Sequence, residues 1–171
     1  EKALIQYRLK VEVEYFIALT AYLPELSTFT STHCEQLREL YRNFTDEQAE
    51  AIKAQERVIN HDVKALEYYL KGWFDEWEWY SSREFVHFGL TSQDINNTAI
   101  PMMLKDALRQ VYLPYLENTM LPLIQARSKD WQEIPMLAHT HGQPATPTRL
   151  GKEIQVFADR LAKQLSHLKA L

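Results

Sequence analysis

Three short polar segments of the chain carry side chains that could bind or protonate a substrate. The most distinctive is His139-Thr140-His141-Gly142-Gln143. A histidine exchanges a proton near neutral pH, so one that is well positioned can act as an acid or a base. Gly142 permits a close approach or an unusual backbone angle, and Gln143 supplies a donor and an acceptor. Acid–base chemistry is one interpretation of this segment, and a buried, hydrogen-bonded structural histidine is the other.

The other two segments also have two interpretations. Asn60-His61-Asp62 lies inside a predicted helix. Because Asn and Asp are poor residues for a helix interior, the segment is either a solvated face or a binding site. Thr91-Ser92-Gln93-Asp94 has the residue types and spacing of a helix start, so capping explains it in part.

Metal and thiol chemistry are poorly supported. His61, His139 and His141 could be combined into a zinc site, but His and Cys clusters at ligand spacing are absent from the sequence. Cys34 follows His33 directly, and adjacency along the chain gives no catalytic geometry. We therefore expect no metal.

Composition excludes several other classes of protein. The 19 Lys and Arg against 23 Asp and Glu give a net charge of -4, which disfavours nucleic acid as a partner. The single cysteine and the absence of a signal peptide favour a cytoplasmic protein. No apolar run approaches the roughly 20 residues that span a membrane. Only 4 glycines disfavour a turn-rich β-sandwich and a Gly-looped nucleotide fold.

The apolar residues recur mainly at helical spacing, so we expect helices to position these segments. We expect a helix over residues 3–23, ended by Pro24. A second helix should run over residues 46–70, opened by a Thr45–Gln48 capping box and closed by Gly72.

The second half of the chain should contain two longer helices. A short helix over 83–88 precedes a helical run over 91–131, which Pro114 or Pro122 should kink or split. Residues 134–145 should form an extended or irregular crossing, and Thr146-Pro147 has the pattern of a helix start. That last helix is still amphipathic at Leu171, so we expect a piece of a longer protein.

Taken in order, the three segments resemble the adenylosuccinate lyase family of the fumarase and aspartase superfamily. The resemblance covers nearly the whole chain and is weakest over 26–45 and 72–83. The matching stretches are Asn60-His61-Asp62-Val63-Lys64-Ala65 with Glu67-Tyr68, His87-Phe88, Thr91-Ser92-Gln93-Asp94-Ile95-Asn96-Asn97, Thr140-His141-Gly142-Gln143-Pro144-Ala145-Thr146-Pro147 and Gly151-Lys152-Glu153.

The resemblance implies an all-α fold and a small-molecule substrate. A small N-terminal helical domain (residues 1–90) would precede the truncated start of a long helical bundle (residues 91–171). The bundle would assemble into a homotetramer with shared active sites. The reaction would be β-elimination of fumarate from adenylosuccinate to give AMP, and from the succinylated aminoimidazole carboxamide ribotide of purine biosynthesis, with no cofactor.

The resemblance also implies roles for individual residues. His141 matches the general acid that protonates the departing nitrogen. Gln143 matches a donor to a substrate carboxylate or to the ordering network around it. Thr91 and Ser92 resemble a hydroxyl pair that binds a carboxylate. Asn60, His61 and Asp62 resemble a substrate-binding strip, with His61 supporting the reacting centre.

The sequence departs from the family pattern in three places. The loop that carries the family's general-base serine is not in these residues, nor is the Arg-Tyr pair that helps to hold the phosphate. His139 stands where relatives commonly have Arg. The chain alone is therefore expected to be inactive. The alternatives are another fumarate-releasing lyase of the superfamily and a non-catalytic helical assembly.

Overall fold

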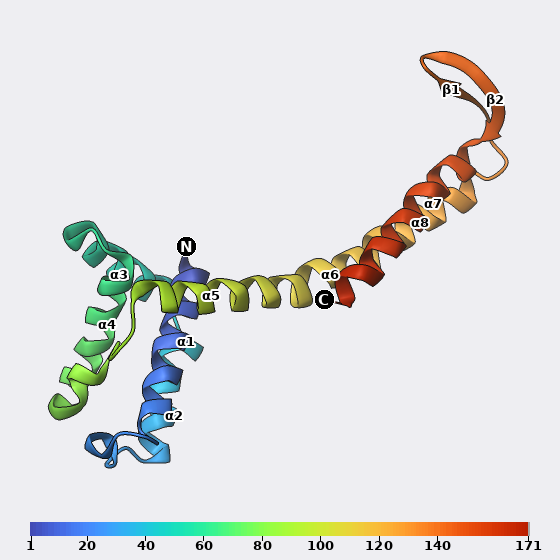
Figure 1. Ribbon diagram of the computed structural model, residues 1–171. Helices are drawn as coiled ribbons and strands as arrows, with labels where there is room; N and C mark the ends of the chain where they lie inside the picture. The colour runs from blue at the N-terminus through green and yellow to red at the C-terminus, as the bar shows by residue number, and fades with distance from the viewer. Residues whose placement is uncertain (171) are drawn as a thin grey trace. The chain divides into compact units, whose positions relative to one another are not determined.

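Helices make up most of residues 1–170, the part of the chain that the computed structural model describes (Figure 1). The all-α prediction is confirmed, and the described strands form a single two-stranded hairpin. No helix within these residues is long and apolar enough to cross a membrane. The chain divides into two compact units, Glu1–Lys105 and Asp106–Leu171, and Leu171 itself lies outside the described residues. The proposed domain division after residue 90 stays a prediction.

The first unit is built from five α-helices and two short 3-10 turns. Its helices are α1 (Lys2–Leu19), α2 (Ser31–Arg42), α3 (Asp46–Ile59), α4 (Asp62–Glu76) and most of α5 (Ser92–Ala107), with 3-10 turns at Pro24–Leu26 and Tyr80–Phe85. The predicted capping box is present, because Thr45 Oγ1 accepts from Gln48 N at 3.3 Å and Gln48 Oε1 accepts from Thr45 N at 2.9 Å. The short helix expected over 83–88 is instead the second 3-10 turn.

Aromatic side chains form a cluster within the largely aliphatic core of this unit. Phe16 of α1 and Phe74 of α4 are fully buried, and their rings meet edge to face at 4.9 Å. Phe29 and Trp79, from the connecting segments, pack against the same pair. Such pairs add to the free energy gained by burying apolar area. The core therefore fixes α1 against α4.

The helix predicted over residues 46–70 is two helices. Asn60 has a φ of 54°, in the left-handed region, and ends α3. Asn adopts this conformation more readily than most residues, and it is a common helix C-cap. Gly72 consequently lies inside α4 and is not a cap. The polar segment Asn60-His61-Asp62 is thus a helix boundary.

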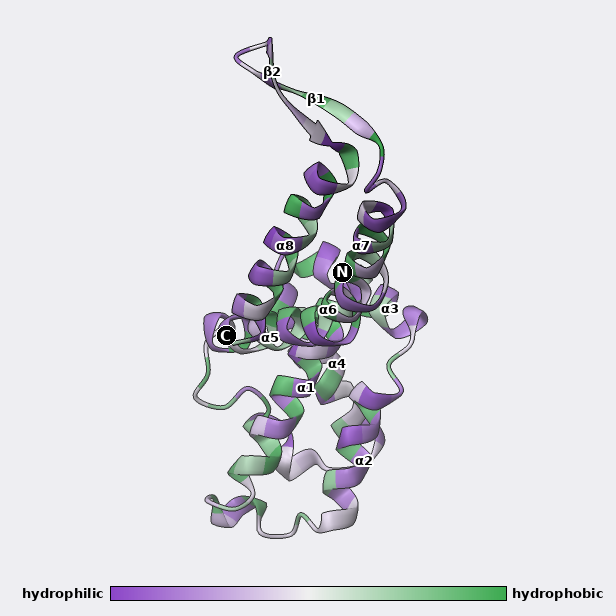
Figure 2. Ribbon diagram, turned by 90° about the vertical axis from the view of Figure 1, so that its right-hand side faces the viewer, coloured by the Kyte–Doolittle hydropathy of each residue, from purple (hydrophilic) through white to green (hydrophobic). Residues whose placement is uncertain are grey.

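The second unit contains a helical run with two prolines, a hairpin and a final helix. After a π-turn (Leu108–Tyr112) come α6 (Leu113–Tyr115), a second π-turn (Leu116–Met120), α7 (Leu121–Asp130), β1 (Pro135–Thr140), β2 (Gln143–Arg149) and α8 (Leu150–Lys169). Figure 2 shows α7 and α8 side by side, with apolar residues interleaved among polar ones.

Of the kink or split expected at Pro114 or Pro122, the split does not occur, because π-turns join the α-helical segments without a break. Each π-turn contains the residue four positions before a proline. Gln110 stands four positions before Pro114, and Asn118 stands four positions before Pro122. A proline has no N–H for the carbonyl of that residue, and its ring would collide with it in a regular α-helix. A π-turn pairs carbonyls with amides five residues ahead. The wider turns accommodate both prolines without ending the helix.

The extended crossing predicted over 134–145 is an antiparallel hairpin. Leu137 pairs with Pro147, and Thr140 pairs with Gln143. The helix start predicted at Thr146-Pro147 is wrong, since β2 continues to Arg149 and α8 begins at Leu150. Strand pairing with β1 outweighs the local capping signal there.

Three charged residues within the described residues are buried, Glu12, Glu67 and Lys71, and Glu12 is the most deeply buried of them. Glu12 of α1 has a fully buried side chain, and its Oε1 lies 2.5 Å from His87 Nδ1. Its Oε2 has no hydrogen-bond partner within residues 1–170. Burial raises the pKa of Glu12 above its usual value, although the contact with His87 acts in the opposite direction. The folded chain therefore holds this proton more tightly than the unfolded chain does.

Two glycines provide a test of helix packing. A Cβ at Gly151 of α8 would lie 2.7 Å from Gln132 backbone atoms and closer still to the Ser128 carbonyl oxygen, whereas a Cβ at Gly72 meets nothing within 4 Å. We predict that Gly151→Ala destabilises the protein by about 1–3 kcal/mol. Gly72→Ala should stabilise it by about 0.5–1 kcal/mol, because it lies inside a helix. Urea unfolding measures both, and destabilisation by Gly72→Ala would restore the capping interpretation.

The buried carboxyl predicts an unusual pH dependence. The stability that Glu12 contributes is complete at low pH and is lost as pH rises through its raised pKa. Glu12→Gln should therefore gain stability relative to the parent as pH rises from about 4 to about 7. Urea unfolding at a series of pH values measures the difference.

Glu14→Gln is the matched control on the same helix. A hydrogen bond from Arg38 lowers the pKa of Glu14, so its contribution is lost as pH falls through that lowered pKa. This variant should therefore lose relative stability as pH rises toward the ordinary glutamate range. Parallel curves for the two variants would contradict the assignment.

Candidate functional site

Two of the three polar segments meet in the first unit. His61 follows the left-handed Asn60 and is the N-cap of α4, where its Nδ1 accepts from Lys64 N at 3.0 Å. Its Nε2 lies 3.4 Å from Ser92 Oγ at the start of α5. The residues are 31 positions apart in the sequence. The fold thus brings the helix boundary at Asn60-His61-Asp62 to the helix start at Thr91-Ser92.

The cap determines which nitrogen of His61 carries the proton. A neutral imidazole has one N–H and one acceptor nitrogen. Because Nδ1 accepts the Lys64 N–H, the proton of the neutral ring is on Nε2, the atom that faces Ser92. That N–H can donate to Ser92 Oγ, which leaves the serine hydroxyl proton free to donate outward.

Thr91 is held by its own helix. Its backbone N–H and its hydroxyl both donate to Asp94 Oδ2, at 2.8 and 3.0 Å. These bonds lower the pKa of Asp94. The predicted helix start is confirmed, and in this arrangement the Thr91 hydroxyl proton is already used. Ser92 is therefore the hydroxyl donor better placed for an incoming anion.

The carboxylate of Asp62 faces into the unit. Its Oδ1 accepts from Val63 N at 2.9 Å, and its Oδ2 lies 2.6 Å from Arg8 Nη2. Partial burial raises the pKa of Asp62, but the bonds from Val63 and Arg8 outweigh it and leave the pKa below its usual value. Asp62 is thus an ionised anchor in the unit. Beside it, an open hollow of about 480 Å³ is lined by Glu56, Arg57, Asn60, His61 and Asp62.

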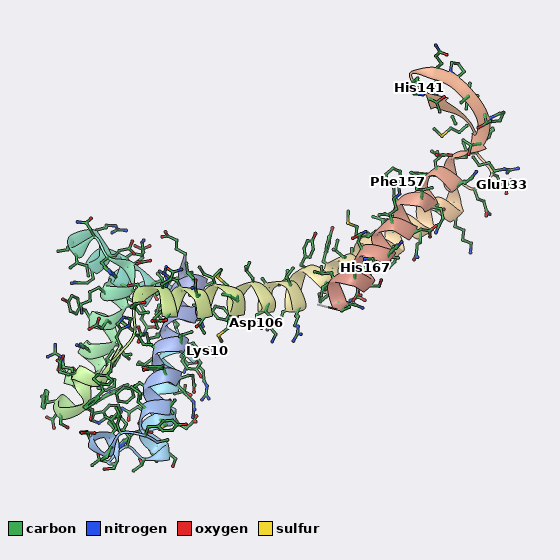
Figure 3. The ribbon with its side chains drawn as sticks, viewed as in Figure 1. Lys10, Asp106, Glu133, His141, Phe157 and His167 are labelled. Atoms are coloured by element: carbon green, nitrogen blue, oxygen red, sulfur yellow. The ribbon has the colours of Figure 1, made fainter. Side chains whose placement is uncertain are left out.

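His141 and Gln143 lie in the second unit, at the tip of the hairpin (Figure 3). His141 has a φ of 52° and Gly142 a φ of 74°, so together they form the turn between the paired residues Thr140 and Gln143. All of these side chains are exposed. Within its unit the ring of His141 is therefore exposed, unlike the buried histidine of the alternative interpretation.

Sequence reasoning missed two residues that support the site. Glu12 contacts His87, whose own φ of 61° lies in the left-handed region, four residues before Thr91. Arg8 contacts both Asp62 and Asn96. The signal for Glu12 was present, since it falls between Leu9, Val13 and Phe16 on the buried face of α1. A charge at such a position needs a partner.

Metal and thiol chemistry have no support in the described residues. No group of three or more His, Cys, Asp or Glu side chains within residues 1–170 lies close enough to hold a metal ion. Burial raises the pKa of the Cys34 thiol, which disfavours the thiolate that a nucleophile requires.

The chain spans a little over a third of the length of three curated relatives. Adenylosuccinate lyase from Dictyostelium discoideum is 46% identical over 99% of the chain, and the chain spans 37% of that protein. Adenylosuccinate lyase from Legionella pneumophila (strain Corby) is 43% identical over 98% of the chain, and adenylosuccinate lyase from Escherichia coli (strain K12) is 39% identical over 98%. The chain again spans 37% of each.

Two solved structures share the fold. A fumarate lyase from Mesorhizobium sp. BNC1 superposes with a TM-score of 0.74 at 19% identity, covering 99% of this chain and 37% of that one. A β-carboxy-cis,cis-muconate cycloisomerase from Acinetobacter calcoaceticus superposes with a TM-score of 0.71 at 20% identity, covering 99% of this chain and 38% of that one. The family model described as lyase matches residues 1–171. The chain therefore belongs to this lyase family.

Proposed function

We propose that the protein carrying this sequence is an adenylosuccinate lyase. It would release fumarate from adenylosuccinate to give AMP, and from the succinylated aminoimidazole carboxamide ribotide of purine biosynthesis. The observation that carries the proposal is the 46% identity to an adenylosuccinate lyase over 99% of the chain. The contact between His61 and Ser92 supports it, because it joins two segments that the family resemblance assigns to substrate binding.

The residues can supply part of the chemistry of this elimination. Removal of a proton next to a carboxylate builds negative charge, and the leaving nitrogen must gain a proton as the C–N bond breaks. His141, exposed at a hairpin tip, is the proposed general acid. Ser92 is the proposed carboxylate donor, with its oxygen held by the Nε2–H of His61.

The remaining binding contacts follow the same proposal. Thr91 would contribute through its position at the start of α5, where backbone N–H groups favour an anion. Asn60 and His61 line the hollow beside α4, and the carboxylate of Asp62 holds that strip in place. Gln143 would donate to a second substrate carboxylate. These groups bind and protonate but include no base, so the general base would come from residues outside this sequence.

We further propose a cytoplasmic homotetramer whose active sites are shared between copies, with no metal and no cofactor. Large apolar side chains exposed on the second unit support assembly through that unit. They include Val111, Tyr112, Tyr115, Leu123 and Phe157, each more than half exposed. Exposed apolar area on this scale is typical of an interaction surface. The chain alone is accordingly expected to be inactive.

Replacement of His141 tests the acid assignment. In the protein that carries this sequence, His141→Ala should lower the turnover of adenylosuccinate by about 10²- to 10⁴-fold, the usual contribution of a general acid. His167→Ala is the control, since His167 is also exposed but lies on α8. Fumarate release followed by absorbance measures both, and near-normal turnover by His141→Ala would rule out the role.

A panel of succinylated amines tests the substrate. The unsubstituted protein should release fumarate from adenylosuccinate and from the succinylated ribotide. Activity on argininosuccinate or aspartate alone would instead identify another lyase of the superfamily. Failure to release fumarate from every compound would favour a non-catalytic assembly.

A further inference from the structure

Arg8 of α1 connects the two polar segments of the first unit. Its Nη2 lies 2.6 Å from Asp62 Oδ2, at the first residue of α4. Its Nε donates to Asn96 Oδ1 at 2.8 Å, in the second turn of α5. The side chain is only 12% exposed. Hydrogen bonds from a guanidinium in such partly dry surroundings are stronger than neutral ones.

The two bonds of Arg8 end next to the proposed site residues. Asp62 directly follows His61, and Asn96 lies one helical turn after Ser92, on the same face of α5. The 3.4 Å contact between His61 Nε2 and Ser92 Oγ lies between these two anchors. The separation of the imidazole and the hydroxyl therefore depends on how far apart Arg8 holds the ends of α4 and α5.

Arg8 lies on a helix that is packed into the core of the unit. Its neighbour Leu9 is fully buried, as are Val13 and Phe16 on the same helix. The core packing of α1 therefore fixes the backbone position from which the Arg8 side chain extends. Arg8 thus links the N-terminal ends of α4 and α5 to a helix that is packed in the core.

The contact requires an arginine. The guanidinium is planar and presents donors in fixed, diverging directions, so one side chain can bond to two acceptors on different helices. A lysine has a single nitrogen on a flexible chain and would favour the charged acceptor, Asp62, over Asn96. The carboxylate of Asp62 is then occupied by Arg8 and Val63, and its part in the site is to hold His61 in place.

We propose that Arg8 is a positioning residue, which holds the His61 imidazole and the Ser92 hydroxyl at the separation that binding of the substrate carboxylate requires. The inference rests on the proposed function, because it concerns the same site. Arg8 itself does not contact the substrate in this proposal. Its loss would let the ends of α4 and α5 move apart, and the contact between His61 and Ser92 would lengthen.

The test compares Arg8→Met, Arg8→Lys and Arg38→Met in the protein that carries this sequence. Arg38 is the matched control, because it is also partly buried and also ties a helix to α1, with bonds of 2.8 and 2.9 Å to Glu14, but contacts no site segment. Arg8→Met should lower kcat/KM for adenylosuccinate by about 10- to 100-fold, as expected for a misplacement of about 1 Å. Arg8→Lys should fall between it and the parent.

Thermal unfolding separates positioning from stability. Arg8→Met and Arg38→Met should both lower the melting temperature, but only Arg8→Met should lower kcat/KM of the folded protein. Asn96→Ala should reproduce part of the loss, and the double variant Arg8→Met with Asn96→Ala should be no worse than Arg8→Met alone. Equal activity losses in Arg8→Met and Arg38→Met, or a loss below about twofold in Arg8→Met, would overturn the proposal.

A crystal structure of Arg8→Met provides a readout that does not depend on activity. The distance between His61 Nε2 and Ser92 Oγ should increase beyond 3.4 Å, and an unchanged distance would overturn the proposal. If the unsubstituted protein releases no fumarate from any succinylated amine, the proposed function fails. A lengthened contact in the variant would then still establish that Arg8 sets this geometry.

Discussion

The hydrogen bond from the Lys64 backbone N–H to His61 Nδ1 is the interaction on which the geometry of the first unit's site depends. It caps α4, and it does so with a side chain that could otherwise rotate freely. Because the bond occupies one ring nitrogen, it fixes both the orientation of the ring and the nitrogen that carries the proton. The same contact that starts a helix thus directs an N–H toward Ser92.

Helix α1 supplies the support for this arrangement from within the core. Two of its charged residues, Arg8 and Glu12, point toward the segments that carry the site instead of toward solvent. Each costs free energy to bury, and each is compensated by a partner on a distant part of the chain. Arg8 holds the ends of α4 and α5, and Glu12 holds His87 in the loop that precedes Thr91. The polar contacts of α1 therefore hold the site residues in place, although no residue of α1 is proposed to contact the substrate.

Patterns of neighbouring residues predicted helix starts correctly where the capping contacts are local. They failed where contacts between residues far apart in the sequence determine the structure. The helix starts at Thr45 and Thr91 follow from side chains within one turn, so they could be identified from spacing alone. The break at Asn60 could not, because the apolar positions on either side, such as Ile52 and Val63, continue at helical spacing. The start predicted at Thr146-Pro147 failed because its residues pair with β1. The residues of the site could be identified by type, and the position of Glu12 on the apolar face of α1 indicated a buried charge. Arg8 and the partner of Glu12 could not be identified, because those contacts join residues far apart in the sequence.

The hairpin turn places the ring of His141 at an exposed tip. A two-residue turn with positive φ at both central positions suits the twist of a hairpin, and Asn-Gly or Asp-Gly meets its backbone requirement. His141-Gly142 has this conformation, with φ values of 52° and 74°. The turn needs a residue that tolerates the left-handed region and does not need an imidazole. The ring is exposed and contributes no burial that would stabilise the turn. Histidine is one of the residues enriched at positive φ, so the turn tolerates it. The exposed ring is then free for the acid role proposed above.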